Sequence, residues 1–120
     1  MFNCEKLEVW HKAIEFADVI YGLTREFPGD ERFGLTKQMR RAAVSISSNI
    51  AEGSSRVSRK YFAHFIEIAV GSLFEVVSQS CIGKRQGFLD EVNYQKIYVL
   101  AEEQSRMLSG LRRSLLETGV

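Results

Sequence analysis

The scarcity of helix-breaking residues is the feature that most constrains the fold of this chain. Its 120 residues include a single proline and nine glycines. Turn-forming residues gather at three places, which are residues 28–34, 53–58 and 87–90. Proline and glycine interrupt helices, so the stretches between these places are free to form long ones. We therefore predict helices at about residues 7–27, 35–53, 58–86 and 90–117.

Apolar residues recur at spacings of three and four in each of these stretches, which is the repeat of one helix face. In the second stretch this face consists of Leu35, Met39, Ala42, Ile46, Asn49 and Gly53. In the first stretch the face is centred on Trp10, Ala13, Ala17, Ile20, Thr24 and Phe27. Val9 and Phe16 lie beside this face and widen it. No stretch shows strand alternation, and short connections favour antiparallel neighbours. The chain is therefore predicted to form one all-α domain over residues 1–120, an antiparallel up-down-up-down four-helix bundle.

Composition narrows the class of protein further. The chain has 16 Lys and Arg against 15 Asp and Glu, so its net charge of +1 indicates neither a nucleic-acid nor a membrane partner. Two cysteines, Cys4 and Cys81, lack the spacing of a disulfide framework or a zinc site. The N-terminus lacks the apolar core of a signal peptide, and no uncharged apolar run reaches the ~20 residues that span a bilayer. We expect a cytoplasmic protein without a membrane partner.

The third predicted helix carries more apolar surface than one bundle core needs. Its apolar side chains cover an arc of about 180°, against about 100° for an ordinary surface helix. The outer edge of this arc consists of Val70, Phe74, Val77 and Cys81. Neighbouring helices of the same chain could wrap around this edge, but a subunit interface accounts better for so wide an arc. We predict a homo-oligomer that assembles through this edge.

Positive charge is concentrated between residues 37 and 60. The basic residues there, which face a single acid at Glu52, are Lys37, Arg40, Arg41, Arg56, Arg59 and Lys60. Antiparallel topology would bring further basic residues to the turn between the second and third helices, namely Lys6, Lys12, Arg106, Arg112 and Arg113. Such clustering suits phosphate contacts, which carry no sequence information, and base-reading motifs are absent. We predict that the cluster at residues 37–60, with Arg106, Arg112 and Arg113, binds RNA or DNA; a solvated basic face without a ligand is the alternative.

No pattern in the chain indicates an enzyme. Four-helix bundles can hold two metal ions with Glu-x-x-His pairs, but His11 with Glu15 and His64 with Glu67 run in the opposite order. The serines of the second helix have no histidine beside them and no Gly-x-Ser-x-Gly turn, and a phosphate-binding glycine loop is missing. We predict no catalytic residue, no metal site and no cofactor.

Asn49 is the one polar residue at a central position on the apolar face of the second helix. A buried amide needs hydrogen-bond partners, and in helical assemblies such a residue can fix the register of its neighbours. We predict that Asn49 lies in the core and bonds to a neighbouring helix or to the turn after Gly53.

Several short motifs resemble those of a known family. They are Leu7-Glu-Val-Trp10, Tyr21-Gly-Leu-Thr24, Phe27-Pro28, Phe33-Gly-Leu-Thr36, Gln38-Met-Arg-Arg-Ala-Ala43, Ser45-Ile46, Asn49-Ile-Ala-Glu-Gly53 and Gly71-Ser-Leu73. They are similar to motifs of the bacterial four-helix bundles called 23S rRNA intervening-sequence proteins. The resemblance implies a cytoplasmic bundle that forms a ring-like homopentamer, and it implies no proven activity. Ser47 stands where family members often carry proline, which predicts a straighter second helix.

A more distant likeness is to the accessory variability protein of diversity-generating retroelements, a pentameric bundle with a basic surface. That likeness implies a nucleic-acid partner and a protein partner such as a reverse transcriptase. The combined prediction is a non-catalytic, self-associating helical bundle, a homopentamer that presents a basic surface to RNA or DNA. The alternative is a structural or protein-interaction module that binds no nucleic acid.

Overall fold

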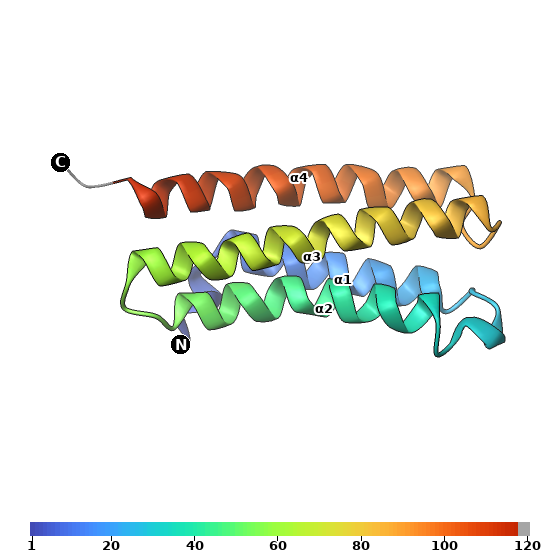
Figure 1. The fold of residues 1–120 in the computed structure, drawn as a ribbon, viewed down its shortest axis with the longest axis horizontal. Helices are drawn as coiled ribbons and strands as arrows, with labels where there is room; N and C mark the ends of the chain where they lie inside the picture. The colour runs from blue at the N-terminus through green and yellow to red at the C-terminus, as the bar shows by residue number, and fades with distance from the viewer. Residues whose placement is uncertain (118–120) are drawn as a thin grey trace.

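The computed structural model describes residues 1–117 as a bundle of long helices. These are α1 (Glu8–Thr24), α2 (Leu35–Ser54), α3 (Arg59–Arg85) and α4 (Glu91–Leu116), with the short 3-10 helices η1 (Asn3–Lys6) and η2 (Gly29–Glu31). The residues described include no strand, in agreement with the predicted all-α class. Figure 1 shows the chain reversing direction at each connection between long helices, so that the start of α1 and the end of α4 lie at the same end. The molecule measures 51 × 22 × 20 Å.

The first helix ends at Thr24 rather than at Phe27. Phe27 precedes Pro28, and a proline ring disfavours helical backbone at the residue before it. The Thr24 hydroxyl donates a hydrogen bond to the Ile20 carbonyl at 2.7 Å, which occupies a carbonyl of the last turn. Phe27 nevertheless remains in the core, where its ring centre lies 5.5 Å from that of Phe88.

The starts of α3 and α4 are capped by Ser58 and Asp90. The Ser58 hydroxyl and the Asp90 carboxylate each accept a hydrogen bond from the backbone N–H three residues later, at 3.3 Å and 2.8 Å. α3 ends in a Schellman motif, in which the Phe88 N–H donates to the Gly83 carbonyl at 2.8 Å. Gly87 has a φ of 82° in this turn, a conformation that glycine adopts without steric cost.

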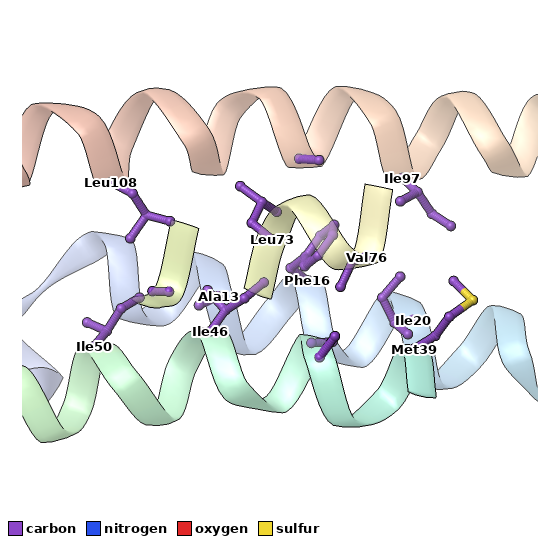
Figure 2. Packing of buried hydrophobic residues seen from close by; sticks show 14 of the residues in the cluster. Ala13, Phe16, Ile20, Met39, Ile46, Ile50, Leu73, Val76, Ile97 and Leu108 are labelled. Atoms are coloured by element: carbon purple, nitrogen blue, oxygen red, sulfur yellow. The ribbon is translucent and has the colours of Figure 1, made fainter. Parts of the chain in front are cut away.

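The hydrophobic core lies along the bundle axis and receives side chains from all four long helices (Figure 2). Its largest fully buried apolar members are Phe16, Ile20, Met39, Ile46, Ile50, Ile66, Leu73, Val76, Ile97 and Leu108. In α1 the core face is rotated from the predicted centre, because Val9 and Phe16 are buried whereas Trp10 and Ala17 are half-buried. The predicted face and the residues beside it include all four of these residues. Periodicity therefore predicts the existence of α1 more accurately than the direction in which its buried face points.

The structure corrects the expectation for Asn49, because the adjacent Ile50 occupies the core position instead. Asn49 is half-buried, and its amide donates within α2, to the Ser45 carbonyl at 2.8 Å and to the Ser45 hydroxyl at 3.0 Å. The Ser45 hydroxyl lies 2.9 Å from that of Ser72, so the polar link from α2 to α3 is made by serines. The amide that is buried in the core is Gln104 of α4, which donates to a carbonyl in the first turn of α1 at 3.2 Å.

α3 packs against both α2 and α4 and keeps an apolar outer edge. Val70 and Val77 are half-buried against the core, whereas Cys81 and Phe74 are exposed, the latter to 64%. The Phe74 side chain is therefore an apolar group that residues 1–117 of one chain leave largely uncovered.

By length and composition α3 is the one described helix that could cross a membrane, and the core helix of a soluble protein meets the same criteria.

Candidate nucleic-acid interface

The basic residues predicted to form one surface are divided between the two ends of the bundle. Lys37, Arg40 and Arg41 lie in the first two turns of α2, beside the connection from α1. The opposite end, where α2 connects to α3 and α4 finishes, holds Arg56, Arg59, Lys60, Arg112 and Arg113, with Arg106 further back along α4. At ~1.5 Å per residue, α2 rises by about 20 Å between Arg41 and its last residue. The predicted cluster therefore belongs to two separate patches.

At the end where α2 connects to α3, most of the arginines are bound to other parts of the chain. Arg56 forms an ion pair with Glu52 at 3.3 Å, and Arg112 forms one with Glu67 at 3.0 Å. Arg59 donates to two carbonyls in the last turn of α4, at 2.6 Å and 3.3 Å. The contacts of Arg59 and Arg112 connect α3 to α4, and that of Arg56 lies at the end of α2. The exposed cations of this patch that make neither an ion pair nor a side-chain hydrogen bond within residues 1–117 are Lys60, Arg106 and Arg113.

A groove of about 540 Å³ opens at the other end of the bundle, between the end of α1 and the start of α2. Its lining residues are Tyr21, Arg32, Phe33, Thr36, Lys37, Arg40, Arg41 and Val44. Four of these residues are cationic, two are aromatic, and none is a carboxylate. Positive charge combined with aromatic rings is the composition of many surfaces that bind nucleic acid.

The walls of the groove are brought together by the turn that leads into α2. Arg32 and Phe33 lie in this turn, after η2, and Tyr21 lies in the last turn of α1. The Glu31 carboxylate accepts a hydrogen bond at 3.0 Å from the first backbone N–H of α2, where the helix dipole favours negative charge. A Cβ at Gly34 would lie 2.9 Å from that carboxylate, so glycine leaves room for this contact. Glu31 therefore shapes the groove by starting α2.

Arg40 anchors the groove to the end of α1. Its Nε donates to the Thr24 hydroxyl at 2.9 Å, and its Nη2 donates to the Tyr21 carbonyl at 3.4 Å. Its guanidinium lies 4.7 Å from the centre of the Tyr21 ring. Lys37 and Arg41, in contrast, are exposed and have no ion pair within residues 1–117. Their charges are therefore available to a ligand, while that of Arg40 also serves the fold.

Arg32 and Phe33 are candidate functional residues that the sequence analysis does not single out. Phe33 is 76% exposed, and the Arg32 guanidinium lies 4.9 Å from the centre of its ring. A phenyl group stacked with an arginine offers a flat apolar surface beside N–H donors. The signal that could have found them is an aromatic residue next to an arginine in a predicted turn, close to further basic residues.

The groups with shifted pKa values lie outside the groove. A hydrogen bond to a glutamate of α4 raises the pKa of Lys12. A hydrogen bond from Lys84 lowers the pKa of Glu91, at the connection between α3 and α4. The pKa of Tyr94 is raised by its contact with the Cys81 thiol, at 3.6 Å from the Tyr94 hydroxyl. These contacts connect neighbouring helices.

Candidate metal ligands are dispersed over the surface. Glu8 precedes His11 in the Glu-x-x-His order of dimetal bundles, a pair that the sequence analysis overlooks. His11 is exposed, and its Nε2 lies 2.7 Å from the Glu5 carbonyl. In the part of the chain that the structure describes, no group of three or more His, Cys, Asp or Glu residues could hold a metal ion.

Comparison with known proteins identifies the family of this chain. The family described as 23S rRNA-intervening sequence protein matches residues 5–110, which include the whole groove. A similar fold occurs in the 1.70 Å crystal structure of a protein with unknown function from the S23 ribosomal protein family of Bacteroides thetaiotaomicron VPI-5482. That match has a TM-score of 0.78 and 25% identity, and it covers 88% of this chain and 98% of the other. No curated protein matches the chain. The match over residues 5–110 shows that the chain belongs to the 23S rRNA-intervening sequence protein family.

Proposed function

We propose that this chain is a non-catalytic, self-associating helical bundle that presents the groove between α1 and α2 to RNA or DNA. One observation carries the proposal, namely the gathering of cations with the exposed Phe33 ring in a groove of about 540 Å³ whose lining includes no carboxylate. Lysine and arginine at a surface bind phosphates, and aromatic rings stack on bases. A cytoplasmic location and assembly as a homopentamer, both expected from the resemblance, belong to the same proposal.

Self-association is supported by the outer edge of α3. Phe74 is 64% exposed and lies on the same edge as the half-buried Val70 and Val77 and the exposed Cys81. Full burial of such a side chain stabilises by roughly 1.5–3 kcal/mol, so covering it with a second copy is favourable. A ring of identical subunits would also repeat the groove, which raises avidity for a long polyanion without any strong single site.

The second candidate is a structural or protein-interaction module that binds no nucleic acid. The observation in its favour is that four of the predicted binding residues make contacts within the bundle, namely Arg40, Arg56, Arg59 and Arg112. Basic residues at these positions have a role in folding without any ligand. A partner such as a reverse transcriptase remains a prediction from the distant resemblance alone.

Charge reversal at each end of the bundle separates these candidates. One double variant, Lys37→Glu with Arg41→Glu, reverses two positive charges in the groove. The control, Lys60→Glu with Arg113→Glu, makes the same change in net charge at the other end of the bundle. We expect the groove variant to bind structured RNA, single-stranded DNA and duplex DNA about tenfold more weakly or worse, and the control variant to keep most of its affinity. Equal losses in the two variants, or no binding of the unaltered protein at low salt, would contradict the proposal.

A further inference from the structure

A polar hollow extends the groove along the surface of α2. This hollow, of about 250 Å³, lies between α2 and α3, where its polar lining residues are Gln38, Arg41, Ser45, Ser72, Glu75 and Gln79. Arg41 lines the groove as well, so its side chain is common to both recesses. From Lys37 to Ser45 the joined surface extends for about 12 Å along α2, at ~1.5 Å per residue.

Gln79, which lines the hollow, carries a hydrogen-bond acceptor that the protein does not satisfy. Gln79 Oε1 is buried and has no hydrogen-bond partner within residues 1–117. Glu75 lines the same hollow, and an ionised carboxylate can only accept hydrogen bonds. A buried acceptor without a donor is costly. Gln79 is only half-buried and lines the hollow, so a rotation of its amide toward the N–H donor of a ligand would give this oxygen the hydrogen bond that the free protein lacks.

The charges of the two recesses orient a nucleic acid strand. Arg41 and Lys37 attract phosphates, whereas Glu75 repels them, so the backbone would follow the groove and a base edge would point into the hollow. The 76% exposed ring of Phe33 offers a stacking surface for a base at the other side of Arg41. In a duplex the faces of the bases are stacked and their pairing edges are occupied, so only unpaired bases can use both features.

We infer that the groove and the hollow together bind single-stranded nucleic acid, with one base stacked on Phe33 and the amino group of a nearby base donating to Glu75 and Gln79. The inference rests on the proposed function and specifies the class of nucleic acid. Cytosine carries an amino donor at N4, whereas uracil carries an acceptor oxygen at the same position. A preference for cytosine over uracil follows, because the uracil oxygen would face the Glu75 carboxylate and the Gln79 oxygen, which repel it and donate no hydrogen bond to it.

Fluorescence anisotropy with the full chain tests this inference, using oligocytidine and oligouridine strands of about 12 nucleotides and an RNA duplex of the same length. We expect oligocytidine to bind at least about fivefold more tightly than oligouridine, and the duplex to bind most weakly. Gln79→Leu, which preserves charge and approximate size, should remove the preference for cytosine. Gln95→Leu, the same substitution at an exposed position of α4 outside the hollow, should retain it.

A second variant tests the stacking contact. Phe33→Ala should weaken the binding of both single strands by at least about fivefold and leave the affinity for the duplex unchanged. Circular dichroism checks that each variant keeps its helix content, and Glu75→Leu, at an exposed position, replaces Gln79→Leu if that variant unfolds.

The outcomes separate this inference from the proposed function. Equal affinity for the two strands, or a cytosine preference that survives Gln79→Leu, would overturn the inference while nucleic-acid binding at the groove still stood. An unchanged affinity of Phe33→Ala for single strands would overturn it as well. Failure of the unaltered protein to bind any of the three nucleic acids would contradict the proposed function and the inference together.

Discussion

Individual small residues determine how closely α2 and α3 approach each other. Gly53 of α2 faces α3, where an added Cβ would lie 2.8 Å from the Phe62 ring and 2.8 Å from the Phe65 Cβ. The hydroxyls of Ser45 and Ser72 meet at 2.9 Å along the same pair of helices. Because larger side chains at these positions would force the helix axes apart, the spacing of α2 and α3 depends on single residues.

We expect Gly53→Ala to destabilise the protein by about 1–3 kcal/mol, because overpacking outweighs the roughly 1 kcal/mol that alanine gains over glycine within a helix. Gly110→Ala is the matched control, since a Cβ at Gly110 of α4 meets nothing within 4 Å. That variant should be more stable than the unaltered protein by up to about 1 kcal/mol. Denaturant unfolding of the two variants measures both effects. A Gly53→Ala protein that is as stable as the control would show that α3 yields easily at this contact.

Residue positions differ in how well sequence alone predicts them. Ser58 and Asp90 are predictable as caps because a cap bonds to a backbone N–H only three residues away. Asn49 is not, because periodicity fixes the direction of an apolar face only roughly, and the neighbouring Ile50, about 100° around the helix, occupies the core position instead. Gln79 Oε1 gives no signal in the sequence, since its missing partner depends on how α2 packs against α3.

At the scale of helices, one arginine joins the end of α1 to the start of α2. Arg40 donates to the Thr24 hydroxyl and the Tyr21 carbonyl and lies over the Tyr21 ring. A cation at the end of α1 also interacts favourably with the negative end of the helix dipole. The next residue, Arg41, makes no ion pair within residues 1–117 and is exposed.

The two adjacent arginines should therefore respond differently to removal. Arg40→Ala is expected to lower the free energy of unfolding by about 1.5–3 kcal/mol, because hydrogen bonds from a charged donor are lost. Arg41→Ala should change it by less than about 0.5 kcal/mol, as is usual for exposed residues. Thermal unfolding of the two variants distinguishes them. Equal and small shifts in Tm would mean that the Arg40 contacts contribute nothing to stability.

Helix length explains why the predicted basic cluster divides. Periodicity predicts that residues 35–53 form a single helix, and the observed α2 spans Leu35–Ser54. A helix of this length necessarily places Lys37 and Arg56 at opposite ends. Counting charges over residues 37–60 ignores this distance and therefore predicts a single cluster. Phe33 and Arg32 lie in a turn, where no periodic pattern indicates which way side chains point.

For the molecule as a whole, near-neutral composition conceals an uneven surface. Sixteen basic and 15 acidic residues average to a net charge of +1, yet the residues that line the groove include four cations and no acid. The hydrophobic content is likewise uneven, because Phe74 and Cys81 on α3 are exposed while the core is filled from all four long helices. The proposed binding of nucleic acid would use the first feature, and the proposed self-association would use the second.

The proposed assembly is a property of the whole molecule that one substitution should remove. Phe74→Glu places a charge on the exposed edge of α3 and should convert an oligomer into monomers without loss of helix content. Val57→Glu, at a fully exposed position in the turn after α2, is the control and should leave the assembly intact. Light scattering during size-exclusion chromatography gives the masses. A monomeric mass for the unaltered protein at micromolar concentration would contradict the predicted assembly.

The salt dependence of binding tests the central claim that this groove binds the phosphates of a nucleic acid. Each phosphate neutralised on a single strand contributes about 0.7 to the slope of log affinity against log salt. Between about 50 and 500 mM salt we predict a linear fall for the unaltered protein, measured with a strand short enough for one groove, and a slope shallower by about 1.4 for Lys37→Gln with Arg41→Gln. Lys60→Gln with Arg113→Gln should keep the slope of the unaltered protein. Identical slopes in all of these proteins, or binding that does not change with salt, would contradict the account.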